Sequence, residues 1–119
     1  MDKSFIYYHN PRCSKSREGL KILEKNTENV KVKVKLYLSD AISFSELEQI
    51  IKKLRIKPID LMRKKEPLIK EKNLSIKDMT DKEIIETLLN YPILIERPIL
   101  VSNNDAAIGR PPEHIKSIL

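Results

Sequence analysis

The clearest pattern of apolar and polar positions in the chain is the run VKVKVKLYL, residues 30–38, where apolar residues alternate with lysines. A period of two predicts a strand with one apolar face. That face would carry Val30, Val32, Val34, Leu36 and Leu38. Upstream, the apolar and aromatic run KSFIYY, residues 3–8, stops at Asn10-Pro11 and predicts a short buried strand followed by a loop.

Helical spacing follows in several places. Residues 14–25 carry a modest apolar stripe among charges. The stretch SFSELE at 43–48 contains two overlapping capping boxes, so a helix begins after either of its first two serines. The stretch TDKE at 80–83 is a further capping box and opens a helix that ends near residue 91. Between them, the charged residues 64–79 predict short helices or loop.

The carboxy-terminal third contains short apolar segments, PILIE, RPILVS and AAIGR, separated by Pro98 and by an Asn-Asn-Asp turn at 103–105. This pattern predicts a β-hairpin, and the Pro111-Pro112 pair begins a final helix. A strand–helix–strand start with a right-handed crossover gives a parallel pair, which the hairpin extends into a mixed sheet. The predicted fold class is therefore α/β and thioredoxin/glutaredoxin-like, with a helical insertion at about 43–90 in a single domain over 1–119.

Composition narrows the classes of protein. A chain of 119 residues with 40% apolar residues forms one core, and one cysteine cannot make an internal disulfide. The net charge of +6 favours anionic partners, but the lysines are interspersed with glutamates, and two Phe, four Tyr and no Trp leave little for base stacking. We therefore expect no nucleic-acid partner. With no long uncharged apolar run, we expect no membrane segment and a cytoplasmic location, where unpaired thiols persist.

The single thiol lies in YHNPRCSKSR, residues 8–17, between the first predicted strand and the first predicted helix. Free N–H groups and the positive end of that helix, together with the neighbouring cations, would stabilise a Cys13 thiolate and equally a bound oxyanion. A lone cysteine is also often an inert buried residue, but its position favours the reactive interpretation. His9 is either a group that transfers protons or stabilises the thiolate, or an ordinary loop histidine.

Three arginines stand apart from the lysine background, and two of them immediately precede proline. A guanidinium binds an oxyanion through two parallel hydrogen bonds, although each arginine taken singly also fits a surface residue. They are Arg63, Arg97 and Arg110. Two distant histidines and one cysteine are too few for a metal site, so we expect none.

Four motifs in this order, HNPRCSKSR, LMRKKEP, ERPILV and IGRPPE, closely resemble the glutaredoxin-dependent (ArsC-type) arsenate reductase family, from about residue 5 to residue 119. The resemblance implies that Cys13 is the nucleophile and that His9 and Ser16 lower its pKa. It also implies a cis peptide bond at Arg97-Pro98. The anion-binding residues that it implies are Arg63, Arg97 and Arg110.

The same resemblance implies reduction of arsenate to arsenite, with glutathione as co-substrate, glutaredoxin as partner and no bound cofactor. A single cysteine requires external thiols, unlike the three-cysteine, thioredoxin-coupled reductases. Two alternatives stay open at this point. One is a non-enzymatic regulator of the Spx type, in which a second cysteine usually occupies the place of Ser16. The other is a glutaredoxin-like thiol oxidoreductase with a different substrate.

Overall fold

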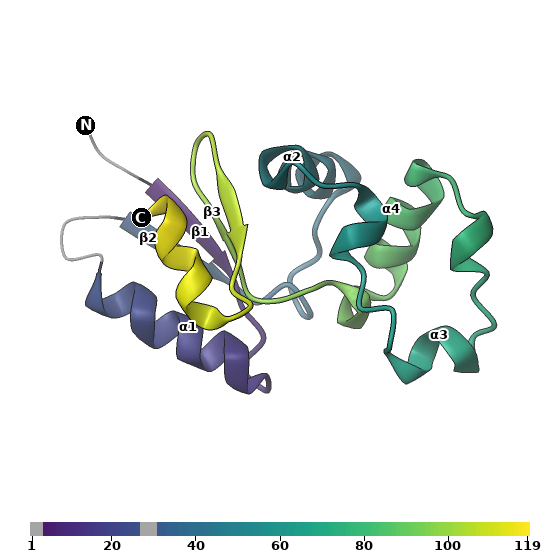
Figure 1. Cartoon of the computed structure of the whole chain (residues 1–119), viewed down its shortest axis with the longest axis horizontal. Coiled ribbons are helices and arrows are strands. Elements are labelled where there is room, and N and C mark those ends of the chain that lie inside the picture. The colour runs from purple at the N-terminus through teal and green to yellow at the C-terminus, as the bar shows by residue number, and fades with distance from the viewer. Residues whose placement is uncertain (1–3, 27–30) are drawn as a thin grey trace. The chain divides into compact units, whose positions relative to one another are not determined.

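The computed structural model describes residues 4–26 and 31–119, and the chain divides into two compact units. Unit 1 comprises residues 1–40 and 97–119, and unit 2 comprises residues 41–96 (Figure 1). The predicted helical insertion of about 43–90 falls within unit 2. That the whole chain behaves as a single domain stays a prediction.

Unit 1 is built on a four-stranded mixed sheet with the order β2-β1-β3-β4. Strand β1 (Ser4–Tyr8) pairs in parallel with β2 (Lys31–Lys35) and antiparallel with β3 (Ile99–Val101). Strand β4 (Ala106–Ile108) completes the hairpin with β3. The predicted parallel start and terminal hairpin are confirmed, and so is the mixed α/β class.

Helix α1 (Ser14–Lys25) and the 3₁₀ helix η4 (Pro112–Ile118) lie side by side in Figure 1 and pack against one face of this sheet. Phe5 and Tyr7, which are alternate residues of β1, point to that face and are 2% and 0% exposed. Burial of such side chains is the main source of stability of the unit. The core on this face consists of Phe5, Tyr7, Leu23, Leu100 and Ile115.

The predicted strand over 30–38 is shorter in the structure, and Val30, like Lys3 of the first predicted strand, lies outside the described residues. The expectation that Leu36 and Leu38 continue its apolar face is wrong. After Lys35 the chain turns, with the amides of residues 39 and 40 bonded to the carbonyl of Leu36 at 3.0 and 2.8 Å. The turn buries Tyr37 instead and leaves both leucines exposed.

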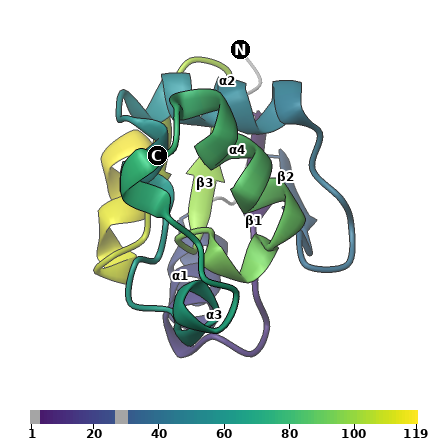
Figure 2. The ribbon, with the colours of Figure 1, turned by 90° about the vertical axis from the view of Figure 1, so that its right-hand side faces the viewer.

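Unit 2 consists of short helices, with α4 packed against α2 (Figure 2). Its elements are α2 (Phe44–Leu54), η1 (Pro58–Leu61), α3 (Pro67–Glu71), η2 (Ile76–Asp78), α4 (Asp81–Asn90) and η3 (Pro92–Leu94). Buried residues of α2 and α4 recur at helical spacing, as the sequence predicted. Segment PILIE is this last 3₁₀ turn and an isolated bridge between Met62 and Ile95, not a strand of the sheet.

Side-chain caps fix where two of these helices begin. Ser43 rather than Ser45 caps α2, since its Oγ accepts the amide of Glu46 at 3.1 Å. The capping box of α4 has both of its bonds: Thr80 N donates to Glu83 Oε1 at 3.0 Å and Glu83 N donates to Thr80 Oγ1 at 3.2 Å.

Two residues of unit 2 adopt left-handed backbone conformations without being glycine. Arg55, at the end of α2, has φ of 58°, and Asn73, after α3, has φ of 51°. Across the described part of the chain, no helix has the length and apolar character needed to cross a membrane.

Candidate active site

Cys13 lies where β1 passes into α1, as its place in the sequence predicted. It is the residue immediately before the helix, with extended backbone angles, and its sulfur is partly exposed. Its amide donates to the carbonyl of Asn10 at 3.0 Å, and its carbonyl accepts the amide of Arg17 at 3.0 Å. The backbone N–H groups of Lys15 and Ser16, in the amino-terminal turn of α1, lie against the thiol. N–H groups in this turn lack partners within the helix.

Ser16 holds this turn in place. Its side chain is fully buried, and Oγ lies 2.7 Å from His9 Nδ1 while accepting the amide of Asn10 at 3.0 Å. The Tyr7 hydroxyl donates to the Ser16 carbonyl at 2.6 Å. Three residues at the end of β1 and just beyond it thus converge on one residue of α1. They fix the first helical turn against the sheet.

His9 is 7% exposed. Burial, helped by the positive charge of Arg17, lowers the pKa of His9, so the imidazole is neutral at neutral pH. Ser16 Oγ already accepts the Asn10 amide, so the arrangement that satisfies both groups has the hydroxyl donating to an unprotonated Nδ1. The hydroxyl proton of Ser16 then points to His9. Ser16 acts on the sulfur through its backbone instead.

The electrostatic surroundings of Cys13 favour the thiolate. Burial raises the pKa of the thiol, but the backbone N–H of Ser16, the guanidinium of Arg97 and the backbone N–H of Lys15 together outweigh it, and the pKa of Cys13 is lowered. Two of these groups are amides of the first turn of α1, and the other is a cation from the opposite end of the sequence.

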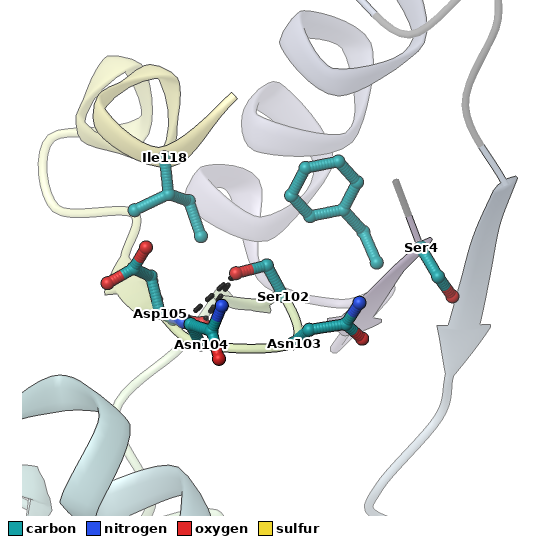
Figure 3. Close-up of a pocket in the computed structure, with 7 residues that line it drawn as sticks. Ser4, Ser102, Asn103, Asn104, Asp105 and Ile118 are labelled. Atoms are coloured by element: carbon teal, nitrogen blue, oxygen red, sulfur yellow. Dashed lines mark hydrogen bonds between the residues drawn. The ribbon is translucent and has the colours of Figure 1, made fainter. Parts of the chain in front are cut away.

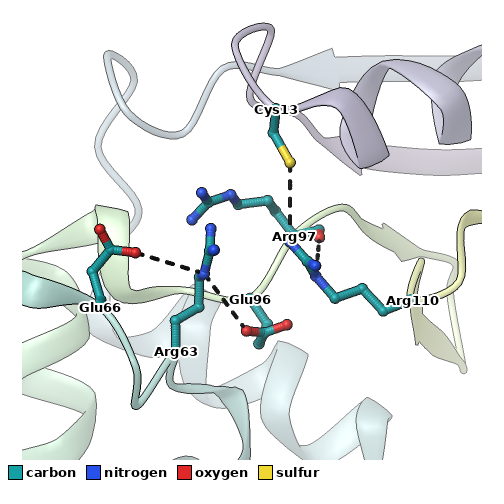
Figure 4. Close-up of polar contacts among 6 residues, drawn as sticks. All are labelled: Cys13, Arg63, Glu66, Glu96, Arg97 and Arg110. Carbon is teal, nitrogen blue, oxygen red and sulfur yellow. Dashed lines mark hydrogen bonds and ion pairs between the residues drawn. The ribbon is translucent and has the colours of Figure 1, made fainter.

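Two of the predicted arginines accompany the thiol within unit 1 (Figure 4). Arg97 is 8% exposed and lies two residues before β3, with Pro98 between them. Arg110 bonds through Nε to the carbonyl of Arg97 at 3.0 Å, and its Nη2 lies 4.0 Å from Cys13 Sγ. The peptide bonds Arg97-Pro98 and Arg110-Pro111 are both cis. The structure thus brings three segments distant in sequence to the same sulfur.

Arg63 belongs to unit 2 and has its own partners there. Its Nε lies 3.7 Å from Glu66 Oε2 and 3.8 Å from Glu96 Oε1 (Figure 4). Its amide donates to the carbonyl of Leu94 at 2.7 Å. Within residues 4–26 and 31–119, no hydrogen-bond partner is found for Arg63 Nη1. That Arg63 joins the other two arginines around an anion stays a prediction.

Sequence reasoning missed the packing behind the site. A Cβ added to Gly19 would overlap the Tyr7 hydroxyl and lie 3.1 Å from Pro98 Cγ, and one added to Gly109 would lie 2.6 Å from Pro98 Cγ. Neither glycine has a positive φ, so each is needed for space. The one signal in the sequence was that the chain has only two glycines. The structure shows that both would meet the proline that follows Arg97.

Unit 1 also has a small pocket of about 200 Å³ at the turn of the β3–β4 hairpin (Figure 3). It is lined by Ser4 and Phe5 at the start of β1, by Ile118 and by the hairpin turn 102–105. Bonds between Ser102 and Asp105 close that turn. Since β1 begins here and leads at its other end into the loop that carries Cys13, the pocket and the thiol are at opposite ends of the strand. No arginine, cysteine or histidine is among the residues that line the pocket.

Comparisons with known proteins agree with this fold and these motifs. A protein-family model described as the ArsC family matches residues 8–118, and the chain belongs to this family, whose fold is thioredoxin-like. It is 42% identical over 120 residues to the uncharacterized protein YfgD of Escherichia coli, covering 100% of this chain and 99% of that one.

The chain is also 43% identical over 117 residues to a protein named arsenate reductase from Haemophilus influenzae, covering 98% of this chain and 99% of the relative. Among solved structures, it is similar to one titled arsenate reductase from Vibrio cholerae. The TM-score is 0.89 at 40% identity, and all of both chains is covered.

Proposed function

We propose that this protein is an arsenate reductase that acts through Cys13, with glutathione and glutaredoxin as reductants. The observation that carries the proposal is a thiol with a lowered pKa beside two guanidinium groups, with Arg110 Nη2 4.0 Å from the sulfur. A nucleophile and cations for a tetrahedral oxyanion are then in one place. The names of the relatives from Haemophilus influenzae and Vibrio cholerae support the same substrate.

Each side chain has a distinct proposed role. Cys13 is the nucleophile. The arsenate oxygens bind to the first-turn N–H groups of α1 and to arginines, and the arginines are Arg63, Arg97 and Arg110. His9 and Ser16 are positioning residues, because they fix the helical turn whose N–H groups stabilise both the thiolate and the incoming anion. No bound cofactor is needed for this chemistry.

In the first step the Cys13 thiolate attacks arsenic. A sulfur–arsenic bond forms, an arsenic–oxygen bond breaks, and the oxygen leaves as water after taking up protons. Glutathione then displaces a second oxygen as water, which places two sulfurs on the arsenic. The arginines favour these steps because they neutralise the charge of the oxyanion that the thiolate must approach.

Reduction requires a further thiol. The glutaredoxin thiolate attacks the glutathione sulfur, a disulfide forms between them, and the electron pair of the broken sulfur–arsenic bond reduces As(V) to As(III). Water then releases arsenite and restores the Cys13 thiol. Both electrons come from external thiols, in keeping with the one cysteine of the sequence. A free thiol of this kind persists in a reducing compartment, so we place the reaction in the cytoplasm.

An NADPH-coupled assay tests the proposal, with arsenate, glutathione, glutathione reductase and glutaredoxin. The native chain should show arsenate-dependent turnover, and Cys13→Ser should show none. Arg97→Ala should raise the arsenate concentration needed for half-maximal rate, with Lys77→Ala as the control, because Lys77 is an exposed cation of unit 2 with no part in the proposed site. Absence of arsenate-dependent turnover in the native chain would eliminate the proposal. Thiol-transfer activity that survives Arg97→Ala unchanged would favour a general thiol oxidoreductase instead.

A further inference from the structure

The exposed apolar side chains of unit 1 are concentrated in one segment. Within the described residues, the large apolar side chains that are exposed are Val34 (43%), Leu36 (39%) and Leu38 (44%). We call these three residues the β2 patch. Val34 belongs to β2, and Leu36 and Leu38 belong to the turn directly after it, so the patch is continuous along the chain although the leucines do not continue the face of the strand.

The β2 patch lies at the end of the sheet that carries Cys13. Strands β1 and β2 are parallel, so their carboxyl ends meet at the same edge of the sheet. The loop to Cys13 leaves from one strand, and the turn with Leu36 leaves from the other. The amide of His9, four residues before the thiol, donates to the carbonyl of Lys35 at 2.9 Å. A molecule seated on the patch is therefore next to the loop that presents the sulfur.

The positive charges of β2 indicate what kind of partner would bind to the patch. Strand β2 is at the edge of the sheet, and Lys31, Lys33 and Lys35 alternate with its valines. Pairing of this edge with a second copy of the chain would bring two rows of lysines together, which is unfavourable. An acidic protein surface with apolar side chains complements both features.

We propose that the β2 patch is the docking surface for an acidic thiol protein, the one that delivers the reducing thiol to the adduct on Cys13. The occupant rests on the proposed function, because a chain with one cysteine receives its second and later thiols from outside. The docked protein buries Leu36 and Leu38, while the lysines of β2 steer its approach.

The test uses a reaction that needs no arsenate. Oxidised glutathione converts native Cys13 to its mixed disulfide with glutathione. Glutaredoxin then attacks the glutathione sulfur, a disulfide forms between them, and Cys13 leaves as thiolate. The second-order rate constant for this transfer of glutathione from Cys13 to glutaredoxin, measured at low ionic strength with limiting glutaredoxin, reports docking. The variants are Leu36→Ser/Leu38→Ser and Lys33→Glu, with Lys77→Glu as the control for the same change of charge on an exposed lysine of unit 2.

We expect the double leucine variant to lower the rate constant about tenfold, which corresponds to about 1.4 kcal/mol. Lys33→Glu should lower it more than Lys77→Glu, and added salt should remove that difference. The rate at which iodoacetamide alkylates Cys13 should be unchanged, showing that the site is intact. Unchanged release of glutathione in the leucine variant overturns the proposal, as does an equal effect of the two lysine variants.

Two other outcomes can be distinguished by the same experiments. A leucine variant that releases glutathione normally but changes sedimentation behaviour would show that a second copy of the chain occupies the patch, and would also overturn the proposal. If the native chain shows no arsenate turnover but the leucine and lysine variants still slow the reaction with glutaredoxin, the proposed function is wrong and the docking surface is still supported.

Discussion

Gly19→Ala should destabilise the protein, although this change usually stabilises a helix. Inside a helix, alanine is favoured over glycine by about 0.5–1 kcal/mol. Here the new Cβ would overlap the Tyr7 hydroxyl and lie 3.1 Å from Pro98 Cγ. Both neighbours are buried, so the added methyl group has no free space to enter.

The size of the effect follows from the neighbours. Overpacking a core costs about 1–3 kcal/mol. Displacing Tyr7 also lengthens its bond to the Ser16 carbonyl, now 2.6 Å, and such a bond contributes roughly 1 kcal/mol. After subtracting the helical preference, we expect Gly19→Ala to lower the free energy of unfolding by about 1–3 kcal/mol. Urea unfolding followed by circular dichroism measures it, and Glu18→Ala, an exposed position on the same helix, should change stability by less than about 0.5 kcal/mol.

The double variant decides whether the hydroxyl of Tyr7 is the cause. Tyr7→Phe removes the overlapping atom and leaves ring carbon Cζ at 3.4 Å from the added Cβ, an ordinary contact. Gly19→Ala should therefore be less harmful in the Tyr7→Phe background, with a coupling free energy of about 1 kcal/mol or more. A stabilising Gly19→Ala, or the same loss in both backgrounds, would refute the packing argument.

Three further measurements test the site and the fold. The pH midpoint for alkylation of Cys13 should lie below the ordinary thiol value of about 8.5 and should rise in Arg97→Ala, because the guanidinium lowers the pKa; an unmoved midpoint would contradict that role. Thr80→Ala should lower the free energy of unfolding by about 0.5–2 kcal/mol through loss of the α4 cap, and an unchanged urea midpoint would count against it. The pKa of His9 is lowered in the folded state, so its contribution to stability is fully present above about pH 6.5 and is lost as pH falls through the folded-state pKa. His9→Gln should flatten that part of the stability profile, and an identical profile would exclude His9 as its source.

Local features of this chain could be predicted from the sequence because their causes are local. The capping box at Thr80 and Glu83, the helix over 14–25 and the place of Cys13 at a strand–helix junction all depend on residues a few positions apart. The failure at Leu36 and Leu38 has a tertiary cause. Alternation continues in the sequence past Lys35, but the chain leaves the sheet there, and a periodic pattern does not record where a strand loses its neighbour.

The candidate site depends on local sequence features and on contacts between residues that are distant in the sequence. The hydrogen bond from Tyr7 to Ser16 spans nine residues and joins a strand to a helix, so no sequence motif predicts it. The approach of Arg110 to Cys13 spans 97 residues, and only the resemblance to a family brought them together in advance. The roles of the arginines in binding an anion stay predictions, since spacing along a chain does not define distance across it.

Gly19 and Gly109, which both lie against Pro98, limit where this protein can be changed without loss of stability. Their replacement would push on the ring of the proline that follows Arg97, so directed evolution of the site has little freedom on that side. The reverse holds at Arg55 and Asn73, where L-residues sit in backbone conformations that glycine adopts without penalty. A thermostable version of the protein would gain glycines there and keep the native pair untouched.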